Sequence, residues 1–164
     1  MPQTADAKPS SNAPVLRLVD ARYGDALTAP LLDEVQLDLA ARYGGPDETP
    51  VAPDEFAPPH GGFLVVTVDG GMAGCAGLRR HDDEAAELKR MYVRPEYRRR
   101  GVARWLLEAV EDRARELGYR RLLLETGAAQ PEAIALYEAC GYEPVPGFGH
   151  YRCSPTSRSF AKDL

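Results

Sequence analysis

A short segment rich in arginine carries the clearest chemical signal in this chain. It runs from Arg98 to Ala103, reads RRRGVA, and stands between a predicted strand and a strongly amphipathic helix. The first turn of a helix leaves backbone N–H groups unpaired and carries the positive end of the helix dipole. Gly101 lets the backbone approach an anion, Ala103 is small for the same reason, and the arginines can pair with phosphate oxygens. The residues alone therefore predict either an anion site or simply a helix start with an exposed basic cluster.

Two common phosphate-binding patterns do not fit this segment. The Walker loop reads G-x-x-x-x-G-K-[ST], and that pattern is absent from the sequence. The dinucleotide fingerprint begins with a glycine directly after a strand, whereas three arginines precede Gly101. An anion bound here would therefore belong to another class of ligand site.

The elements that must position this segment alternate in type along the chain. Apolar periodicity and turn residues predict helices near 30–42, 102–117 and 131–140 and strands near 15–19, 63–68, 72–80, 85–93, 119–125, 142–145 and 158–163. Strands 63–68, 72–80 and 85–93 form an antiparallel meander, and the crossover helix makes 119–125 a parallel neighbour of 85–93. We expect an α/β fold of the α+β type, with a mixed, mostly antiparallel sheet of about six to seven strands and helices on both faces.

Length and composition fit one globular domain. The chain has 164 residues, of which 44% are hydrophobic and 27% charged, so one core can form without disulfides. We predict a disordered leader over 1–14, rich in Ala, Pro and Ser, and a single domain over 15–164. Cys75, Cys140 and Cys153 form no C-x-x-C pair and the histidines lack ligand spacing, so we expect neither disulfides nor a metal site.

Charge and hydropathy limit the partners. The net charge of -5 and the pI of about 5.3 argue against nucleic acid and are compatible with a cationic or amine substrate. The first residues lack the basic and apolar parts of a signal peptide, and no apolar run approaches the roughly 20 residues that span a bilayer. We therefore expect a cytoplasmic protein that does not bind membranes.

With its surroundings, the arginine segment resembles the GNAT superfamily of N-acetyltransferases. Their acetyl-CoA motif reads [RQ]-x-x-G-x-[GA] at a strand–helix junction, and Arg98 to Ala103 fits it. The preceding residues 87–97 and the later segment 133–142 (AIALYEACGY) are also similar to the family's motifs. The resemblance covers the chain from about Val15 and is most specific from Glu87 to Tyr142. It implies the GNAT fold and the transfer of an acetyl group from acetyl-CoA, without a metal, to a primary amine by direct attack in a ternary complex.

The resemblance also implies a set of acetyl-CoA-binding residues. In the family, the strand before the loop splays from its parallel neighbour, and its freed backbone groups pair with the pantetheine arm. The loop amides would hold the pyrophosphate, and the thioester would lie between strands 85–93 and 119–125. Gln130 stands where the family commonly has Asn. The implied cofactor-binding residues are Met91, Tyr92, Val93, Arg98, Arg99, Arg100, Gly101, Val102, Ala103, Arg104 and Gln130.

Tyr137 matches the family's tyrosine near the thioester sulfur. Attack of an amine on a thioester expels a thiolate, and a phenol with a pKa near 10 can protonate it. The other interpretation is a core tyrosine on the apolar face of its helix. The resemblance favours a catalytic acid.

Glu87 is a candidate for the base that takes the proton from the amine. Some family members carry a catalytic glutamate at this position. Strand alternation predicts that Glu87, Lys89, Met91 and Val93 share one face. The alternatives are an edge glutamate paired with Lys89 or an arginine, a base role for Glu125 at the cleft, or a water chain.

The acceptor and the assembly remain open at this level. The implied acceptor is a small-molecule or peptide amine, and the Pro-rich segment Pro46–Pro59 is a loop that could cover it. A C-terminal strand offers a possible homodimer contact. The alternative function is a catalytically silent acyl-CoA-binding sensor or regulatory module.

Overall fold

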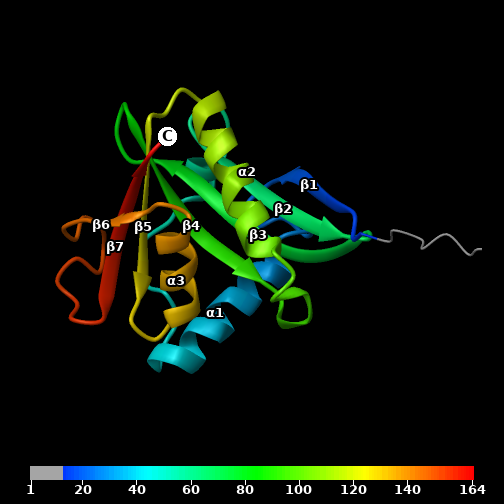
Figure 1. The fold of residues 1–164 in the computed structure, drawn as a ribbon, viewed down its shortest axis with the longest axis horizontal. Helices are drawn as coiled ribbons and strands as arrows, with labels where there is room; N and C mark the ends of the chain where they lie inside the picture. Colours follow the sequence, from blue (N-terminus) through cyan, green and yellow to red (C-terminus); the bar gives the residue numbers. More distant parts are fainter. Residues whose placement is uncertain (1–12) are drawn as a thin grey trace, which may run out of the picture.

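The computed structural model describes residues 13–164, which form one sheet with three α-helices (Figure 1). In chain order the helices and strands are β1 Leu16–Ala21, α1 Ala29–Tyr43, β2 Gly62–Val68, β3 Gly71–Arg80, β4 Ala85–Val93, α2 Val102–Glu116, β5 Arg121–Gly127, α3 Pro131–Ala139, β6 Glu143–Pro144 and β7 Ser157–Asp163. Short 3₁₀ helices lie at Pro53–Phe56 (η1) and Pro95–Tyr97 (η2). The predicted leader over 1–14 lies outside the described residues, apart from its last two.

The sheet has seven strands in the order β1-β2-β3-β4-β5-β7-β6. Neighbouring strands pair antiparallel except β4 and β5, which are parallel and joined by the crossover helix α2. The predicted α/β class, the mixed and mostly antiparallel sheet and the strand number are therefore confirmed. The predicted loop Pro46–Pro59 differs in containing the single turn η1, whose Phe56 is buried.

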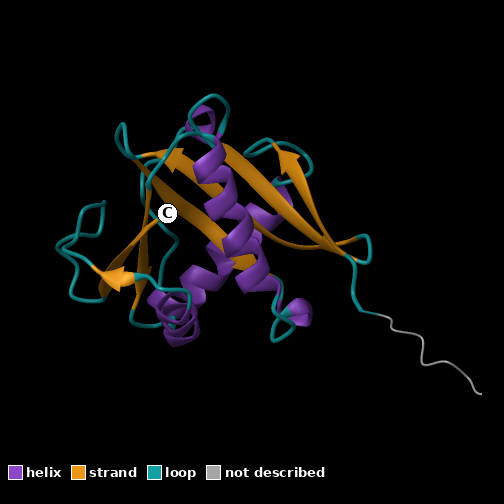
Figure 2. Cartoon of the chain, turned by 45° about the horizontal axis from the view of Figure 1, so that its top comes forward, coloured by secondary structure: helices purple, strands orange, loops and turns teal. Residues whose placement is uncertain are grey.

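Helices cover both faces of the sheet. Helices α2 and α3 contribute to one core cluster, and α2 lies in front of the strands in Figures 1 and 2. Helix α1 and η1 contribute to a second cluster with Phe63 and Val65. Strand β2 serves both clusters, because Leu64 and Val66 point to the α2 side by simple alternation.

Helix α2 is fixed to the sheet by apolar packing and by one buried carboxylate. Leu106 and Leu107 are fully buried, and burial of each such side chain stabilises the fold by about 1.5–3 kcal/mol. The exception on this face is Glu111, which accepts hydrogen bonds from Tyr142 (3.0 Å) and Lys162 (2.9 Å).

Within residues 13–164, no helix is both long and apolar enough to cross a lipid bilayer.

Strand β4 contains a bulge near its middle. The register with β3 shifts between Cys75 and Gly77, so that two β4 residues, Arg90 and Met91, face a single β3 residue there. Arg90 has a φ of 57°, in the left-handed region that a non-glycine residue adopts at an energetic cost. One extra residue in a strand reverses the face to which all later side chains point.

The bulge overturns one prediction from the sequence. Alternation placed Glu87, Lys89, Met91 and Val93 on a single face, and this is wrong. Glu87 and Lys89 lie on the α1 side, where Lys89 contacts Thr49. Met91 and Val93 pack with the cluster of α2 and α3 instead. The strand thus presents charged side chains to the α1 side of the sheet before the bulge, and apolar side chains to the α2 side after it.

Pairing between β4 and β5 ends early. The parallel register runs from Ala85 opposite Arg121 to Leu88 opposite Leu124 and stops there. Beyond this point β4 continues to Val93 without a β5 partner. The two central strands therefore part at the middle of the sheet.

Candidate active site

A cleft of about 700 Å³ opens where β4 and β5 part. Its walls come from α1, the loop after α1, the splayed half of β4, the end of β5, the residues just before α3 and Tyr137 of α3. Tyr151, from the long loop before β7, lines the same cleft. This volume is within the usual range for small-molecule sites.

The arginine loop and the start of α2 present unpaired backbone amides. Within the described residues, the N–H groups of 99–104 have no hydrogen-bond acceptor, and the first bond of the helix runs from the Trp105 N–H to the Gly101 carbonyl (3.0 Å). Gly101 has a φ of 76°, and, apart from the glycine and its two chain neighbours, no described residue has an atom within 4 Å of the place where a Cβ would be. This geometry is that of an anion site at a helix N-terminus.

The three consecutive arginines do not have the same surroundings. The Arg98 Nε donates a hydrogen bond to the Val93 carbonyl (2.8 Å), and its guanidinium lies over the ring of Tyr92 and 3.8 Å from Asp38. Arg98 therefore fastens the loop to the end of β4 and to α1. Arg99 and Arg100 are exposed, and in the described part of the chain they form no ion pair.

Tyr137 projects from α3 into the cleft from the side opposite α1. Its side chain is 7% exposed, and its hydroxyl has only the sulfur of Met91 as a partner among residues 13–164, at 4.0 Å. Burial, with a smaller contribution from Cys140, raises the pKa of Tyr137 above its ordinary value. The hydroxyl is therefore protonated across the physiological range, and among the described residues it has no nitrogen or oxygen partner.

Gln130 joins α3 to α1 at the edge of the cleft. Its Oε1 accepts a hydrogen bond from the Tyr43 hydroxyl (3.1 Å). Nearby, Arg42 contacts Glu132 at 2.6 Å and donates to the Ala129 carbonyl at 2.9 Å. These contacts hold the end of α1 against the start of α3 across the gap that the parting strands leave.

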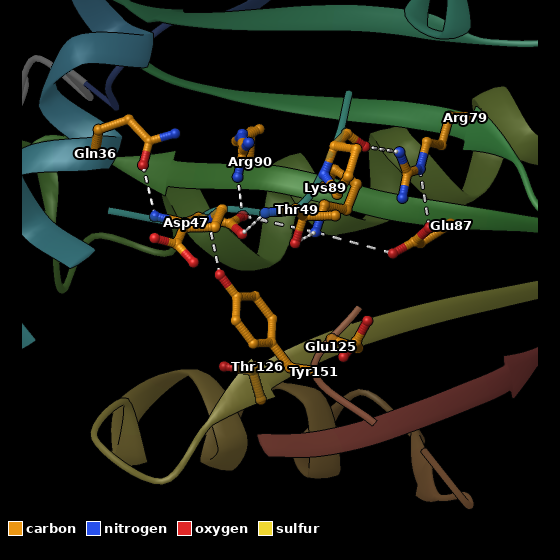
Figure 3. A network of polar contacts seen from close by, with 12 residues as sticks. Gln36, Asp47, Thr49, Arg79, Glu87, Lys89, Arg90, Glu125, Thr126 and Tyr151 are labelled. Carbon is orange, nitrogen blue, oxygen red and sulfur yellow. Dashed lines mark hydrogen bonds and ion pairs between the residues drawn. The ribbon is translucent and has the colours of Figure 1, made fainter. Parts of the chain in front are cut away.

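On the α1 side, the cleft rests on a buried network of charged side chains (Figure 3). Arg90 pairs with Asp47, which belongs to the loop after α1. Lys89 lies 3.7 Å from the Asp47 carboxylate and 4.0 Å from that of Glu87. Arg79 on β3 donates to Glu87 at 2.9 Å. The network therefore links two strands and the loop in one layer.

Known proteins are similar to this chain in both sequence and fold. The model of the acetyltransferase (GNAT) family matches residues 32–142. The IAA acetyltransferase of Azospirillum brasilense is 35% identical over 135 residues, which cover 82% of this chain and 88% of that protein. The chain belongs to the GNAT acetyltransferase family.

Solved structures agree with this GNAT assignment. A Klebsiella pneumoniae protein assigned as an acyl-CoA N-acyltransferase superposes with a TM-score of 0.77 at 27% identity, covering 91% of this chain and 97% of the other. A GNAT family acetyltransferase from Elizabethkingia anophelis, solved with acetyl-CoA bound, gives a TM-score of 0.66 at 17% identity over 91% and 98% of the two chains. The resemblance inferred from the motifs and the GNAT fold are thus both confirmed.

Of the two candidate bases, Glu87 is held away from the cleft. Its strand is interior rather than an edge, and the residue is 4% exposed. The Oε2 of Glu87 accepts a hydrogen bond from Arg79. The Oε1 of Glu87 lies 4.0 Å from the Lys89 Nζ and has no hydrogen-bond partner within the described residues. The predicted pairing with Lys89 or an arginine is therefore present with both kinds of cation.

Glu125 lies on the opposite wall of the GNAT cleft, on β5. It lines the cleft, and its Oε2 has a long contact of 3.4 Å with the Ser157 hydroxyl. Its Oε1 is buried without a hydrogen-bond partner in the described part of the chain. The Cα of Gly149 packs directly against this carboxylate, where a side chain would collide with it.

Four residues of the site were not among the predicted site residues, namely Lys89, Arg90, Asp47 and Tyr151. Lys89 and Arg90 are charged residues in a strand predicted to be interior, and this conflict was a usable signal of a buried polar site. Asp47 and Tyr151 lie in loops without apolar periodicity or a recognisable motif.

At no point in residues 13–164 do three or more His, Cys, Asp or Glu side chains gather in a way that could hold a metal ion.

Proposed function

We propose that this protein transfers an acetyl group from acetyl-CoA to a primary amine, which attacks the thioester directly in a ternary complex. The observation that carries the proposal is the cleft between β4 and β5, into which Tyr137 presents a hydroxyl whose only polar contact among the described residues is the Met91 sulfur. The unpaired amides at the start of α2, the helix that follows β4, add a second feature. Membership of the GNAT family supports the reaction class. The catalytically silent sensor is the alternative.

The donor would lie along the splayed half of β4. The amides from Arg99 to Arg104 are suited to the pyrophosphate, since a helix N-terminus favours negative charge. The free edge of β4 around Met91 is suited to the pantetheine amides, as an added strand would be. Gln130 keeps a side-chain amide N–H₂ for the same arm, because only its Oε1 is engaged within the described residues.

The chemistry needs one acid and one base. The amine nitrogen attacks the carbonyl carbon, the C–S bond breaks, and Tyr137 gives its proton to the departing thiolate. The proton lost by the amine passes to a carboxylate. Glu125 is better suited than Glu87 to receive it, because Glu125 lines the cleft and forms no ion pair within the described residues, whereas Arg79 and Lys89 flank Glu87. Solvent then restores both protonation states.

A thiol-release assay tests the proposal. Acetyl-CoA is mixed with the protein and a panel of amino acids, their amides, simple amines and short peptides, and an amine-free sample measures hydrolysis. We expect release of CoA that depends on one class of amine, with the acetylated amine identified by mass spectrometry. Saturable binding of acetyl-CoA without release in any sample would favour the sensor instead.

A further inference from the structure

The buried network beneath the cleft contains more positive than negative charge. The side chains of Arg79, Lys89 and Arg90 are 14%, 7% and 3% exposed, and the two carboxylates among them, Asp47 and Glu87, are 12% and 5% exposed. A third carboxylate, from Glu55, contacts Arg79 at 3.3 Å. That side chain is 43% exposed, so water compensates much of its charge. The buried layer therefore has an excess of one positive charge.

The excess charge is located at Lys89. Each arginine has a carboxylate in direct contact, Glu87 for Arg79 and Asp47 for Arg90. The Lys89 ammonium has three N–H donors, but its contacts are all long, at 3.4 Å to the Thr49 hydroxyl, 3.7 Å to Asp47 and 4.0 Å to Glu87. The carboxylates are thus shared with, or already taken by, the arginines.

An under-compensated buried ammonium is costly for the fold. Transfer of a charged group out of water without close partners carries a large free-energy penalty. Desolvation lowers the pKa of Lys89, and the nearby Glu87 opposes that shift. Lys89 lines the cleft, so a partner for its ammonium can arrive from the cleft without any rearrangement of the sheet.

The opposite wall carries the complementary charge. Glu125 on β5 lines the cleft, and among the described residues its Oε2 has only a long contact of 3.4 Å, with the Ser157 hydroxyl. Figure 3 shows Glu125 across the gap from the strand that bears Lys89. The cleft therefore offers a cation on one wall and a carboxylate on the other. A ligand that satisfies both must itself carry both signs of charge.

We propose that the acceptor is a zwitterionic amine, an α-amino acid or a close aminocarboxylate analogue, whose carboxylate is bound by Lys89 while its amine lies at Glu125. One excess positive charge matches a monoanionic carboxylate better than a dianionic phosphate. A peptide N-terminus has a neutral amide in place of that carboxylate and leaves the charge of Lys89 without an anionic partner. This inference rests on the proposed acetyl transfer and narrows its acceptor to one class.

Matched acceptors test the inference directly. Each common amino acid is compared with its amide and its decarboxylated amine in the thiol-release assay. We expect at least one amino acid to exceed both analogues by tenfold or more in kcat/KM, mainly through KM. The amide has the less basic amine and is the better nucleophile at neutral pH, so reactivity alone would give the opposite order.

Two substitutions assign the preference to Lys89. In Lys89→Met we expect kcat/KM for the preferred amino acid to fall about tenfold to a hundredfold, the range of one charge-assisted hydrogen bond, and the value for its amide to stay within threefold. Lys89→Arg keeps the charge and should retain the preference. Arg80→Met removes an equal charge from an exposed site at the end of β3 and should change neither value.

The outcomes separate this inference from the proposed function. Equal or faster reaction of amides and simple amines overturns the zwitterionic acceptor and leaves acetyl transfer intact. Absence of release with every amine contradicts both. A preference for the acid that persists in a folded Lys89→Met protein overturns the role of Lys89. If Lys89→Met does not fold, loss of the acid preference in Lys89→Arg overturns that role as well.

Discussion

The two sides of the cleft are built from different kinds of interaction. The proposed donor side is a stretch of consecutive residues, 98–104, whose backbone amides from 99 onward are unpaired within the described residues because a loop meets a helix start. The acceptor side consists of side chains from β3, β4, β5 and two loops, such as Asp47 with Arg90 and the Glu48 N–H with the Tyr151 hydroxyl at 2.7 Å. In the proposed function, backbone geometry thus serves the donor, which is common to the family, and side chains serve the acceptor, which varies.

The residue between the two sides should give the largest effect. Tyr137→Phe removes the hydroxyl and leaves the ring packed against Tyr142 and Phe160. Loss of a general acid lowers kcat by about 10²- to 10⁴-fold, with the KM values of both substrates little changed. Tyr119→Phe is the matched control, since its hydroxyl donates to the His60 carbonyl (2.7 Å) rather than to the cleft. Equal kcat values for wild type and Tyr137→Phe would leave Tyr137 as a core residue.

The pH profile provides a second measurement on the same residue. The acid must be protonated to act, and burial raises the pKa of Tyr137 above the usual value of about 10. The protonated form therefore persists as the pH rises through 10, and kcat should show no alkaline fall in this region from the tyrosine. A fall with a midpoint near 10 that vanishes in Tyr137→Phe would contradict the raised pKa.

Asp47→Asn should have the second largest effect, a loss of stability together with weaker binding of the acceptor. Arg90 is 3% exposed and would lose its only close carboxylate among the described residues. Breaking a buried ion pair by removing one partner costs about 3–5 kcal/mol, and we expect about 3 kcal/mol because the amide keeps a hydrogen bond. Urea unfolding measures the loss. Acceptor KM should rise in the folded protein, while donor KM stays constant.

The control for that substitution is an exposed pair of the same composition. Asp83 contacts Arg80, and the side chains are 87% and 45% exposed. Such pairs contribute about 0–1 kcal/mol, so Asp83→Asn should be nearly silent. Similar unfolding free energies for Asp47→Asn and Asp83→Asn would show that the buried network of charged side chains does not stabilise the acceptor side.

Gly101→Ala tests the donor side with a smaller expected effect. The residue has a φ of 76°, so alanine destabilises the protein by about 1–2 kcal/mol, and its methyl occupies the space proposed for the pyrophosphate. We expect donor KM to rise about tenfold and acceptor KM to stay constant. Gly118→Ala carries the same strain, with a φ of 91° after the other end of α2, and should lower stability alone. Equal donor KM values in the two variants would remove the donor site from this loop.

The difference between the two sides explains which parts of the fold and the site could be predicted from the sequence. Helices, strands and the arginine loop follow from spacings of a few residues, so their order and class were predictable. The splay of β4 was inferred from the family, and the pairing that stops at Leu88 is consistent with it. The bulge at Arg90 was not predictable, because no glycine or turn residue marks it and it depends on pairing with β3.

The acceptor side was hidden for a related reason. Lys89 and Arg90 interrupt an otherwise buried strand, which signals a polar site but does not say what compensates the charge. Their partner Asp47 lies more than 40 residues earlier in the chain, in a loop without periodicity. Contacts of this kind come from the tertiary structure, so the motifs predicted a donor and left the acceptor open.

The smallest expected effect concerns the contact that joins the two loops over the cleft. Tyr151→Phe leaves the Glu48 N–H without its acceptor, and an exposed hydrogen bond contributes about 0.5–1.5 kcal/mol. Acceptor KM should therefore rise only about twofold to tenfold, whereas donor KM and kcat should not change. Tyr23→Phe serves as the control, because that ring stacks on Phe56 in the α1-side core. A change in donor KM in Tyr151→Phe would mean that the two sides are coupled through the loops, and the division into a backbone-built donor side and a side-chain-built acceptor side would have to be abandoned.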